Sequence, residues 1–190
     1  YIETEAEGQI YVLFKRFFFL NFILTSVTSI EIFILCNEVI TVWLGSDFVW
    51  PISIVALLVY NNYSRYILQA CEAFRGAAGL YSPKPFVKYL SLLEGIVNLI
   101  ASLFFILVFD MGAFGVFLGT LVSTFVSTFA VPWIVYKFLF KKSLLEYYVL
   151  YLKYFFVALL AMCTSYIVFK QLYTTSHWLN ILMGAGTSIM

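Results

Sequence analysis

The sequence predicts an all-α integral membrane protein with about six transmembrane helices. Of the 190 residues, 63% are hydrophobic and only 11% are charged, whereas a soluble domain carries about 25% charged residues. Apolar runs of about 20 residues recur along the chain, which is the length that an α-helix needs to cross a bilayer. Runs of this length also argue against a membrane β-barrel, whose strands alternate over about ten residues.

Charged residues divide the chain into four predicted parts. Residues 1–16 form an interfacial connector, 17–136 four spans, 137–153 a basic connector, and 154–190 further spans of which the last is cut short. Because the chain begins with Tyr1 and ends at Met190 within an apolar run, we expect it to be a fragment of a longer protein. The predicted helices cover approximately 17–36, 50–75, 89–109, 114–136, 154–169 and the residues from 178 onward.

The helix predicted for 50–75 begins apolar and ends charged. Its polar residues follow at steps of four, four, three and three, so a helix of 3.6 residues per turn gathers them into one row. These residues are Asn61, Arg65, Gln69, Glu72 and Arg75. A charge left in hydrocarbon costs roughly 2.5–3.5 kcal/mol, so the row is expected to face protein or water. We therefore predict that this helix lines a hydrated cavity.

Two neighbouring predicted spans carry similar polar rows. One contains Asn21, Thr25, Thr28 and Glu31, and the other contains Ser91, Glu94, Asn98 and Ser102. Helices with polar rows can enclose one shared cavity, so we expect Glu31, Glu94 and Asn98 to line it together with the row of 61–75.

The span at 114–136 carries small residues at steps of four, namely Gly115, Gly119, Ser123 and Ser127. Such a stripe lets another helix approach closely, so we assign these residues to helix packing. Only a short turn, Asp110 to Ala113, separates this span from the preceding one. The two spans are therefore expected to form a tight antiparallel hairpin.

Loop charges predict the orientation. With the N-terminus in the cytoplasm, the inner connections hold nine basic residues and the outer ones hold only Lys170. The inner residues are Lys15, Arg16, Arg75, Lys84, Lys88, Lys137, Lys141, Lys142 and Lys153. This asymmetry follows the positive-inside rule.

The sequence lacks the patterns that would indicate an enzyme. It has no metal-ligand spacing, no nucleophile elbow and no phosphate-cradling glycine loop, so no catalytic, metal or cofactor site is predicted. The single histidine, His177, is expected to be a satisfied interfacial residue, and Cys36, Cys71 and Cys163 to be small core residues. A net charge of +1 gives no indication of nucleic-acid binding.

A transporter fits the pattern better, because it needs polar faces, closely packed small residues and Gly/Pro breaks. The guanidinium groups of Arg65 and Arg75 suit an anionic group such as phosphate. Glu31, Glu72 and Glu94 suit the neutralisation of those arginines or the carriage of coupling protons. For Arg75 and Glu94, near the predicted boundary, a purely structural role is an equal alternative, in the case of Arg75 as an ion pair with Glu72 three residues before it.

Several short motifs resemble the second half of bacterial polysaccharide flippases of the multidrug/oligosaccharidyl-lipid/polysaccharide exporter superfamily. They are EVITVWLG at 38–45, AFRG at 73–76, Gly79-Leu80-Tyr81, Asn98, and GAFGVFLGT at 112–120. The resemblance implies a two-lobe transporter of 12–14 helices in the bacterial cytoplasmic membrane, of which this chain would be the later part of the C-terminal lobe. It also implies alternating-access flipping of undecaprenyl-pyrophosphate-linked oligosaccharide repeat units for capsule, exopolysaccharide or O-antigen, alongside polymerase and export partners.

Three other functions remain open at this stage. They are a multidrug or small-solute exporter of the same superfamily, a membrane polysaccharide polymerase or acyltransferase, and a purely structural membrane subunit. An enzyme of that kind predicts a large outer loop with Arg, His or Asp, and a structural subunit predicts that the charged rows are dry protein contacts.

Overall fold

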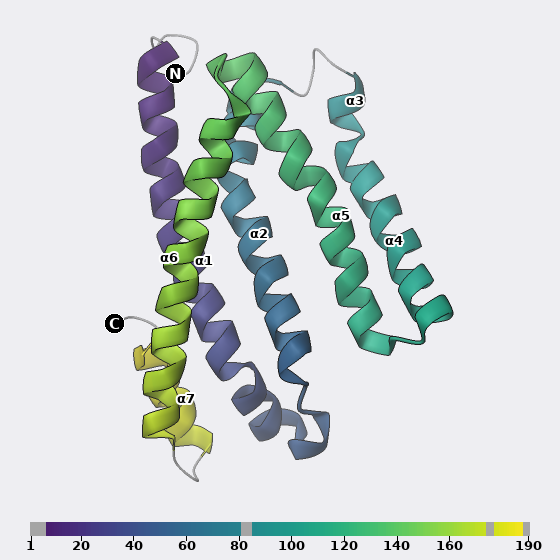
Figure 1. The fold of residues 1–190 in the computed structure, drawn as a ribbon, viewed down its shortest axis with the longest axis vertical. Coiled ribbons are helices and arrows are strands. Elements are labelled where there is room, and N and C mark those ends of the chain that lie inside the picture. The colour runs from purple at the N-terminus through teal and green to yellow at the C-terminus, as the bar shows by residue number, and fades with distance from the viewer. Residues whose placement is uncertain (1–6, 81–84, 174–176, 188–190) are drawn as a thin grey trace.

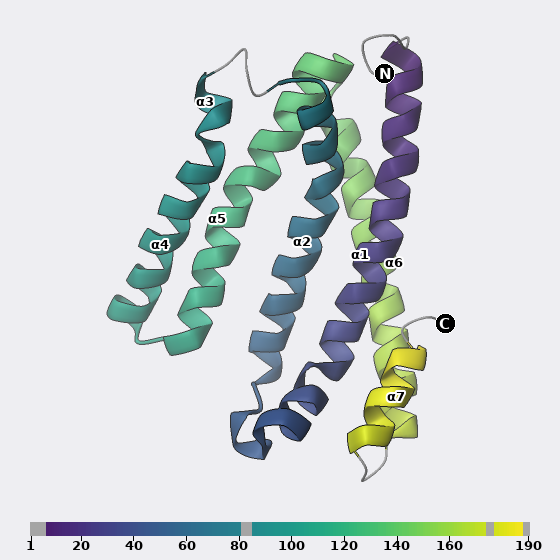
Figure 2. The same cartoon turned by 180° about the vertical axis from the view of Figure 1, so that it is seen from behind.

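The computed structural model describes residues 7–80, 85–173 and 177–187, and nearly all of them are helical. Figures 1 and 2 show long helices running roughly antiparallel, with the hairpin of α4 and α5 on one side of α2 and with α1 and α6 on the other. The helices are α1 (Glu7–Leu44), α2 (Ile52–Ala77), α3 (Pro85–Lys88), α4 (Leu90–Phe109), α5 (Gly112–Val135), α6 (Leu144–Leu172) and α7 (His177–Thr187). Two short elements, the 3₁₀ turn η1 (Ser46–Phe48) and the π-helical turn η2 (Tyr136–Phe140), complete the described chain.

Four of these segments are long and apolar enough to cross a membrane: Gly8–Leu44, Leu90–Phe109, Gly112–Phe140 and Leu144–Leu172. The protein is therefore an all-α protein with the character of a multi-pass membrane protein. Helix α2 has sufficient length at 26 residues but carries the polar row, and α7 has 11 residues.

Helix α1 is longer than the predicted first span. It runs for 38 residues from Glu7 to Leu44, because neither glycine nor proline interrupts it between Gln9 and Leu44. Residues 7–16, predicted as a connector, are its first turns, and residues 37–44, predicted as a loop, are its last turns. Lys15 and Arg16 do not end the helix, since long cationic side chains extend from an apolar helix toward the aqueous boundary.

The predicted basic connector 137–153 is also largely helical. Its first residues form the π-helical turn η2, Lys141 adopts a left-handed conformation with φ of 51°, and α6 begins at Leu144. The side chain of Ser143 caps α6 by accepting a hydrogen bond from the backbone N–H of Leu145 at 3.2 Å. Helix α6 thus begins ten residues before the predicted span at 154.

Pro132 lies inside α5 and leaves a carbonyl of the preceding turn without its helical donor. In a regular helix the N–H of residue 132 would bond to the carbonyl of Thr128. That carbonyl instead accepts a hydrogen bond from the hydroxyl of Tyr148, on α6, at 3.3 Å. The contact ties the C-terminal part of α5 to α6.

The hairpin of α4 and α5 forms as predicted. Helix α4 ends at Phe109, Asp110 caps it in a left-handed conformation with φ of 53°, and α5 begins at Gly112. Helix α4 packs on α5, and α5 in turn packs on α2 (Figure 1). The hairpin therefore joins the remaining helices mainly through α5.

An aromatic core joins α1, α2, η2 and α6. Phe14, Phe18, Tyr136 and Tyr147 are fully buried in it, and the contacting ring centroids among these four lie 5.6–5.9 Å apart. This core lies toward the end of the bundle where α1 begins and α2 and α5 end (Figure 2). It fixes α1, α2 and α6 as the base against which the hairpin is placed.

Candidate functional site

The polar row of α2 faces the hairpin of α4 and α5 across an open groove of about 520 Å³. Four of the five predicted row residues line this groove: Asn61, Arg65, Gln69 and Glu72. The opposite wall contains Ser91 and Glu94 of α4 together with Thr120 and Ser127 of α5. The groove thus carries polar groups on both sides, although α4 and α5, which form one wall, are the most apolar of the long helices.

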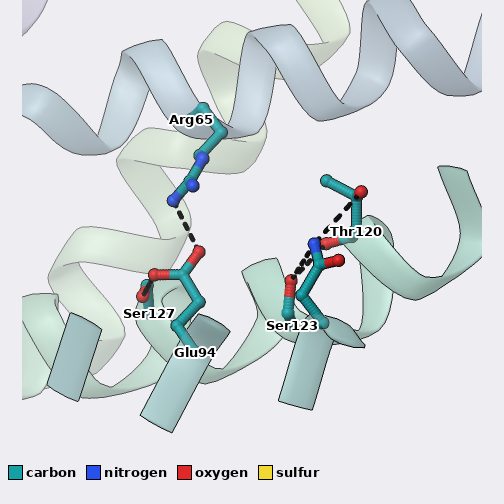
Figure 3. A network of polar contacts seen from close by, with 6 residues as sticks. Arg65, Glu94, Thr120, Ser123 and Ser127 are labelled. Atoms are coloured by element: carbon teal, nitrogen blue, oxygen red, sulfur yellow. Dashed lines mark hydrogen bonds and ion pairs between the residues drawn. The ribbon is translucent and has the colours of Figure 1, made fainter. Parts of the chain in front are cut away.

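Arg65 and Glu94 join the two walls of the groove. Arg65 Nη1 donates to Glu94 Oε1 at 2.5 Å, and the second carboxylate oxygen accepts from the hydroxyl of Ser127 (Figure 3). The Arg65 side chain is 52% exposed, whereas the Glu94 side chain is only 11% exposed. The carboxylate is therefore held by α5 and shielded, while the guanidinium keeps donors facing the groove.

A second groove of about 590 Å³ lies next to the first and shares Arg65, Ser91 and Glu94 with it. Its remaining polar lining comes from Asn98, Ser102 and Ser123. The ion pair of Arg65 and Glu94 therefore stands at the boundary between two polar grooves.

Asn98 connects α4 to α5. Its amide nitrogen lies 3.2 Å from the hydroxyl oxygens of both Thr120 and Ser123, and its amide oxygen accepts from Ser102 at 3.3 Å. Figure 3 shows Thr120 and Ser123 on the α5 side of this network. Because these groups satisfy one another, Asn98 primarily fixes the hairpin and only borders the second groove.

The small-residue stripe of α5 is buried at all four positions. A methyl group added at Gly119 would lie 2.7 Å from the Cα of Ser102, and one added at Gly115 would lie 3.1 Å from the Cβ of Phe105. Side chains at these two positions would force α4 away from α5. The structure thus places Gly115, Gly119 and Ser123 against α4, and Ser127 against Glu94.

The predicted row residue Arg75 is placed differently from the rest. Its side chain is only 3% exposed and forms an ion pair with Glu72, Nη2 to Oε2, at 2.5 Å. Among the residues that the structure describes, Arg75 does not line the groove, whereas Glu72 does. This placement favours the structural alternative for the Glu72–Arg75 pair.

Glu31 also lies away from the groove. It lines a separate, mostly apolar groove with Trp43, Trp50 and Leu58. The row on α1 to which it belongs packs partly on the opposite side of α2, where Asn21 Nδ2 donates to the carbonyl of Tyr66 at 2.6 Å. The first three predicted spans therefore do not enclose one cavity: α5 takes the place that was expected for α1.

Three polar lining residues belong to none of the predicted rows and not to the small-residue stripe: Asn62, Tyr66 and Thr120. Asn62 follows Asn61 directly and also contacts Ser29 of α1, with its amide nitrogen 3.4 Å from the serine hydroxyl. Thr120 follows Gly119 of the small-residue stripe. Asn62 and Tyr66 directly follow Asn61 and Arg65 of the predicted row, and this adjacency was the sequence feature that could have indicated them as lining residues.

No group of His, Cys, Asp and Glu side chains in the described ranges could hold a metal ion. His177 is remote from the groove and contacts Glu38 of α1, Nδ1 to Oε2, at 2.7 Å. The groove thus offers amides and hydroxyls around one guanidinium, Arg65, and two carboxylates, Glu94 and Glu72, which are paired with Arg65 and Arg75. Of the charged lining groups, Arg65 is the one suited to binding an anion.

Comparison with known proteins gives no relative: no family model, no curated protein and no solved structure matches the chain. A functional assignment therefore depends on the geometry of the groove and on the sequence pattern.

Proposed function

We propose that the chain is part of a flippase that moves undecaprenyl-pyrophosphate-linked oligosaccharide repeat units across the bacterial cytoplasmic membrane by alternating access. In this proposal the chain supplies the later part of the C-terminal lobe of a two-lobe transporter. Its N-terminus lies on the cytoplasmic side, and it acts as a transporter, not an enzyme, for surface polysaccharide synthesis alongside polymerase and export partners.

One observation carries the proposal: a half-exposed arginine lines a groove that has polar groups on both walls, between α2 and the apolar hairpin of α4 and α5. Its partner, Glu94, is bound on the other side by Ser127. A guanidinium offers five donors, and Glu94 contacts Arg65 through one terminal nitrogen. Arg65 thus supports recognition of a phosphate or pyrophosphate group that enters the groove.

The uncharged polar part of the lining suits the sugar portion of such a substrate. Asn62, Gln69, Ser91 and Thr120 present amides and hydroxyls, which can exchange hydrogen bonds with water for hydrogen bonds with a carbohydrate. The lipid tail would remain in the bilayer beside the exposed apolar face of α4. Leu99, Ile100 and Leu107 of that face are 61–77% exposed.

Movement is proposed to involve the hairpin of α4 and α5 relative to α2. The hairpin is internally tied by the Asn98 network and by close packing at Gly119. Its side-chain links to α2 include Arg65 with Glu94 and Asn61 with the carbonyl of Phe117 at 3.1 Å. A phosphate that replaces Glu94 on Arg65 would remove one of these links, and this exchange would couple substrate entry to opening of the groove.

The experiment compares surface polysaccharide in cells that carry Arg65→Ala, Arg65→Lys or the control Arg16→Ala in the complete protein. Arg16 is exposed on α1, outside the lining of the groove. We expect Arg65→Ala to abolish surface polysaccharide at normal membrane abundance, Arg65→Lys to retain part of it, and Arg16→Ala to retain it. Normal polysaccharide in the Arg65→Ala strain would contradict the proposal. Substrate competition in vesicles separates this function from drug or small-solute export.

A further inference from the structure

Two lysine ammonium groups approach the ring of Tyr11 at the end of the bundle where α1 begins. Lys15 Nζ, one helical turn further along α1, lies 5.0 Å from the ring centroid. Lys142 Nζ, in the segment just before α6, lies 4.8 Å from the same centroid. Both distances fall within the range in which a cation is attracted to an aromatic ring.

The ring of Tyr11, which both ammonium groups approach, is held in place by contacts on several sides. Its centroid lies 5.2 Å from that of Phe140 and 6.1 Å from that of Tyr136, both approached edge-on, and it stacks on Phe14. Its hydroxyl donates to Glu146 Oε2 at 2.9 Å. The two ammonium groups therefore converge on a fixed point between α1 and α6.

These charges remain available at the surface. Both nitrogens lie about 5 Å from one centroid, so they are at most about 10 Å apart, which is about one Debye length at 0.1 M salt. The nearby carboxylate, Glu146, is 3.9 Å from Lys142 and 45% exposed, so it offsets only part of the positive charge. Among the side chains that the structure describes, the two lysines and Glu146 thus leave a net positive charge at this point.

Exposed apolar side chains follow the two lysines along α1 and α6. Leu145, three residues after Lys142, is 68% exposed, and Phe19, one helical turn after Lys15 and so on the same face of α1, is 45% exposed. A ligand that satisfies both surfaces has a negative head and a hydrocarbon tail. Tyrosine and lysine are moreover the residues that accumulate at headgroup depth.

We propose that Tyr11, Lys15 and Lys142 form a binding site for the phosphate of an anionic phospholipid, with the acyl chains lying along the exposed faces of α1 and α6. The site is separate from the Arg65 groove and does not depend on the function proposed for it. It would hold the start of α1 against the start of α6 at the membrane surface.

Native mass spectrometry of the purified protein with phosphatidylglycerol or phosphatidylcholine tests the proposal. The wild type is expected to retain phosphatidylglycerol preferentially. Each lysine near an anionic surface contributes about fivefold in affinity, so Lys15→Gln/Lys142→Gln should bind phosphatidylglycerol about 25-fold more weakly. The control Lys153→Gln removes an exposed lysine elsewhere on α6 and should bind like the wild type.

A variant that binds the lipid more tightly shows that weaker binding by the lysine variants is not caused by misfolding. Glu146→Gln removes the competing carboxylate and should bind phosphatidylglycerol severalfold more tightly, which a misfolded protein would not do. Wild-type binding by the double lysine variant, or an equal loss in Lys153→Gln, would overturn the proposal. Displacement of the lipid by an equal concentration of inorganic phosphate would also overturn it, because the site would then recognise a soluble anion.

Discussion

Glu94 of α4 is bound by Arg65 of α2 at 2.5 Å, while its second oxygen accepts from Ser127 of α5. One carboxylate thus connects three helices, and it does so from a position that is only 11% exposed. A buried carboxylate that loses a charged partner is costly, whereas an amide in its place is not. The role of Arg65 in transport therefore has to be separated from its effect on stability.

Arg65→Ala is expected to lower the free energy of unfolding by about 1–3 kcal/mol, because Glu94 loses its charged donor while remaining shielded. The double variant Arg65→Ala/Glu94→Gln should recover most of this loss, since a neutral amide still reaches Ser127. Denaturant unfolding in detergent measures both effects. A double variant that is less stable than Arg65→Ala would contradict the compensation.

In the transport assay, the same double variant distinguishes substrate binding by Arg65 from neutralisation of Glu94 by Arg65. It is expected to be stable and still unable to support surface polysaccharide, because the guanidinium is absent. If it restored export, Arg65 would act by neutralising Glu94 and would have no direct role in binding the substrate.

Gly119→Val should separate α4 from α5, because the new side chain would meet the backbone of Ser102. Overpacking of this kind typically costs about 1–3 kcal/mol. Gly95→Ala, on α4, is the matched control: nothing lies within 4 Å of an added methyl group there. Thermal unfolding should show the control to be as stable as the wild type or slightly more stable, since alanine favours helix by up to about 1 kcal/mol. Equal effects at the two positions would show that close packing at Gly119 is unimportant.

Tyr148→Phe should destabilise the protein by about 1 kcal/mol, because the carbonyl of Thr128 loses its donor. The cost should be smaller in a Pro132→Ala background, where residue 132 regains an N–H for that carbonyl. Tyr154→Phe serves as the control, since the ring of Tyr154 stacks on Phe22 at 4.4 Å and the substitution keeps the ring. A double-mutant cycle on unfolding free energies measures the coupling, and strict additivity would exclude it.

The sequence was sufficient to predict the helical membrane class, the hairpin and most of the polar row. Helical periodicity determines which residues share a face, so the sequence alone groups Asn61, Arg65, Gln69 and Glu72, and all four line the groove. The position of the turn at Asp110 and Gly112 could also be predicted from the sequence, because only a few residues separate two apolar runs there.

Periodicity does not say which neighbour a face will meet. Glu31 and Asn98 share faces that look like the row on α2, but Glu31 lies in another groove and Asn98 is used within the hairpin. Arg75 lies in register with the row but does not line the groove, because its side chain is buried and paired with Glu72. Helix ends were also misjudged at 137–153, since charged residues bound an apolar run without ending a helix.

The central claim is that the polar row of α2 faces water, and labelling of engineered cysteines by a membrane-impermeant thiol reagent tests it most directly. The background replaces Cys36, Cys71 and Cys163 by alanine, and single cysteines replace Gln69 and Asn62, which line the groove, or Ile67 and Ala70, which are fully buried. In intact cells, and in inverted vesicles for the opposite side, we expect labelling at positions 62 and 69 and protection at 67 and 70. Protection at all four positions from both sides would contradict the account, because the row would then lie in a dry contact between helices.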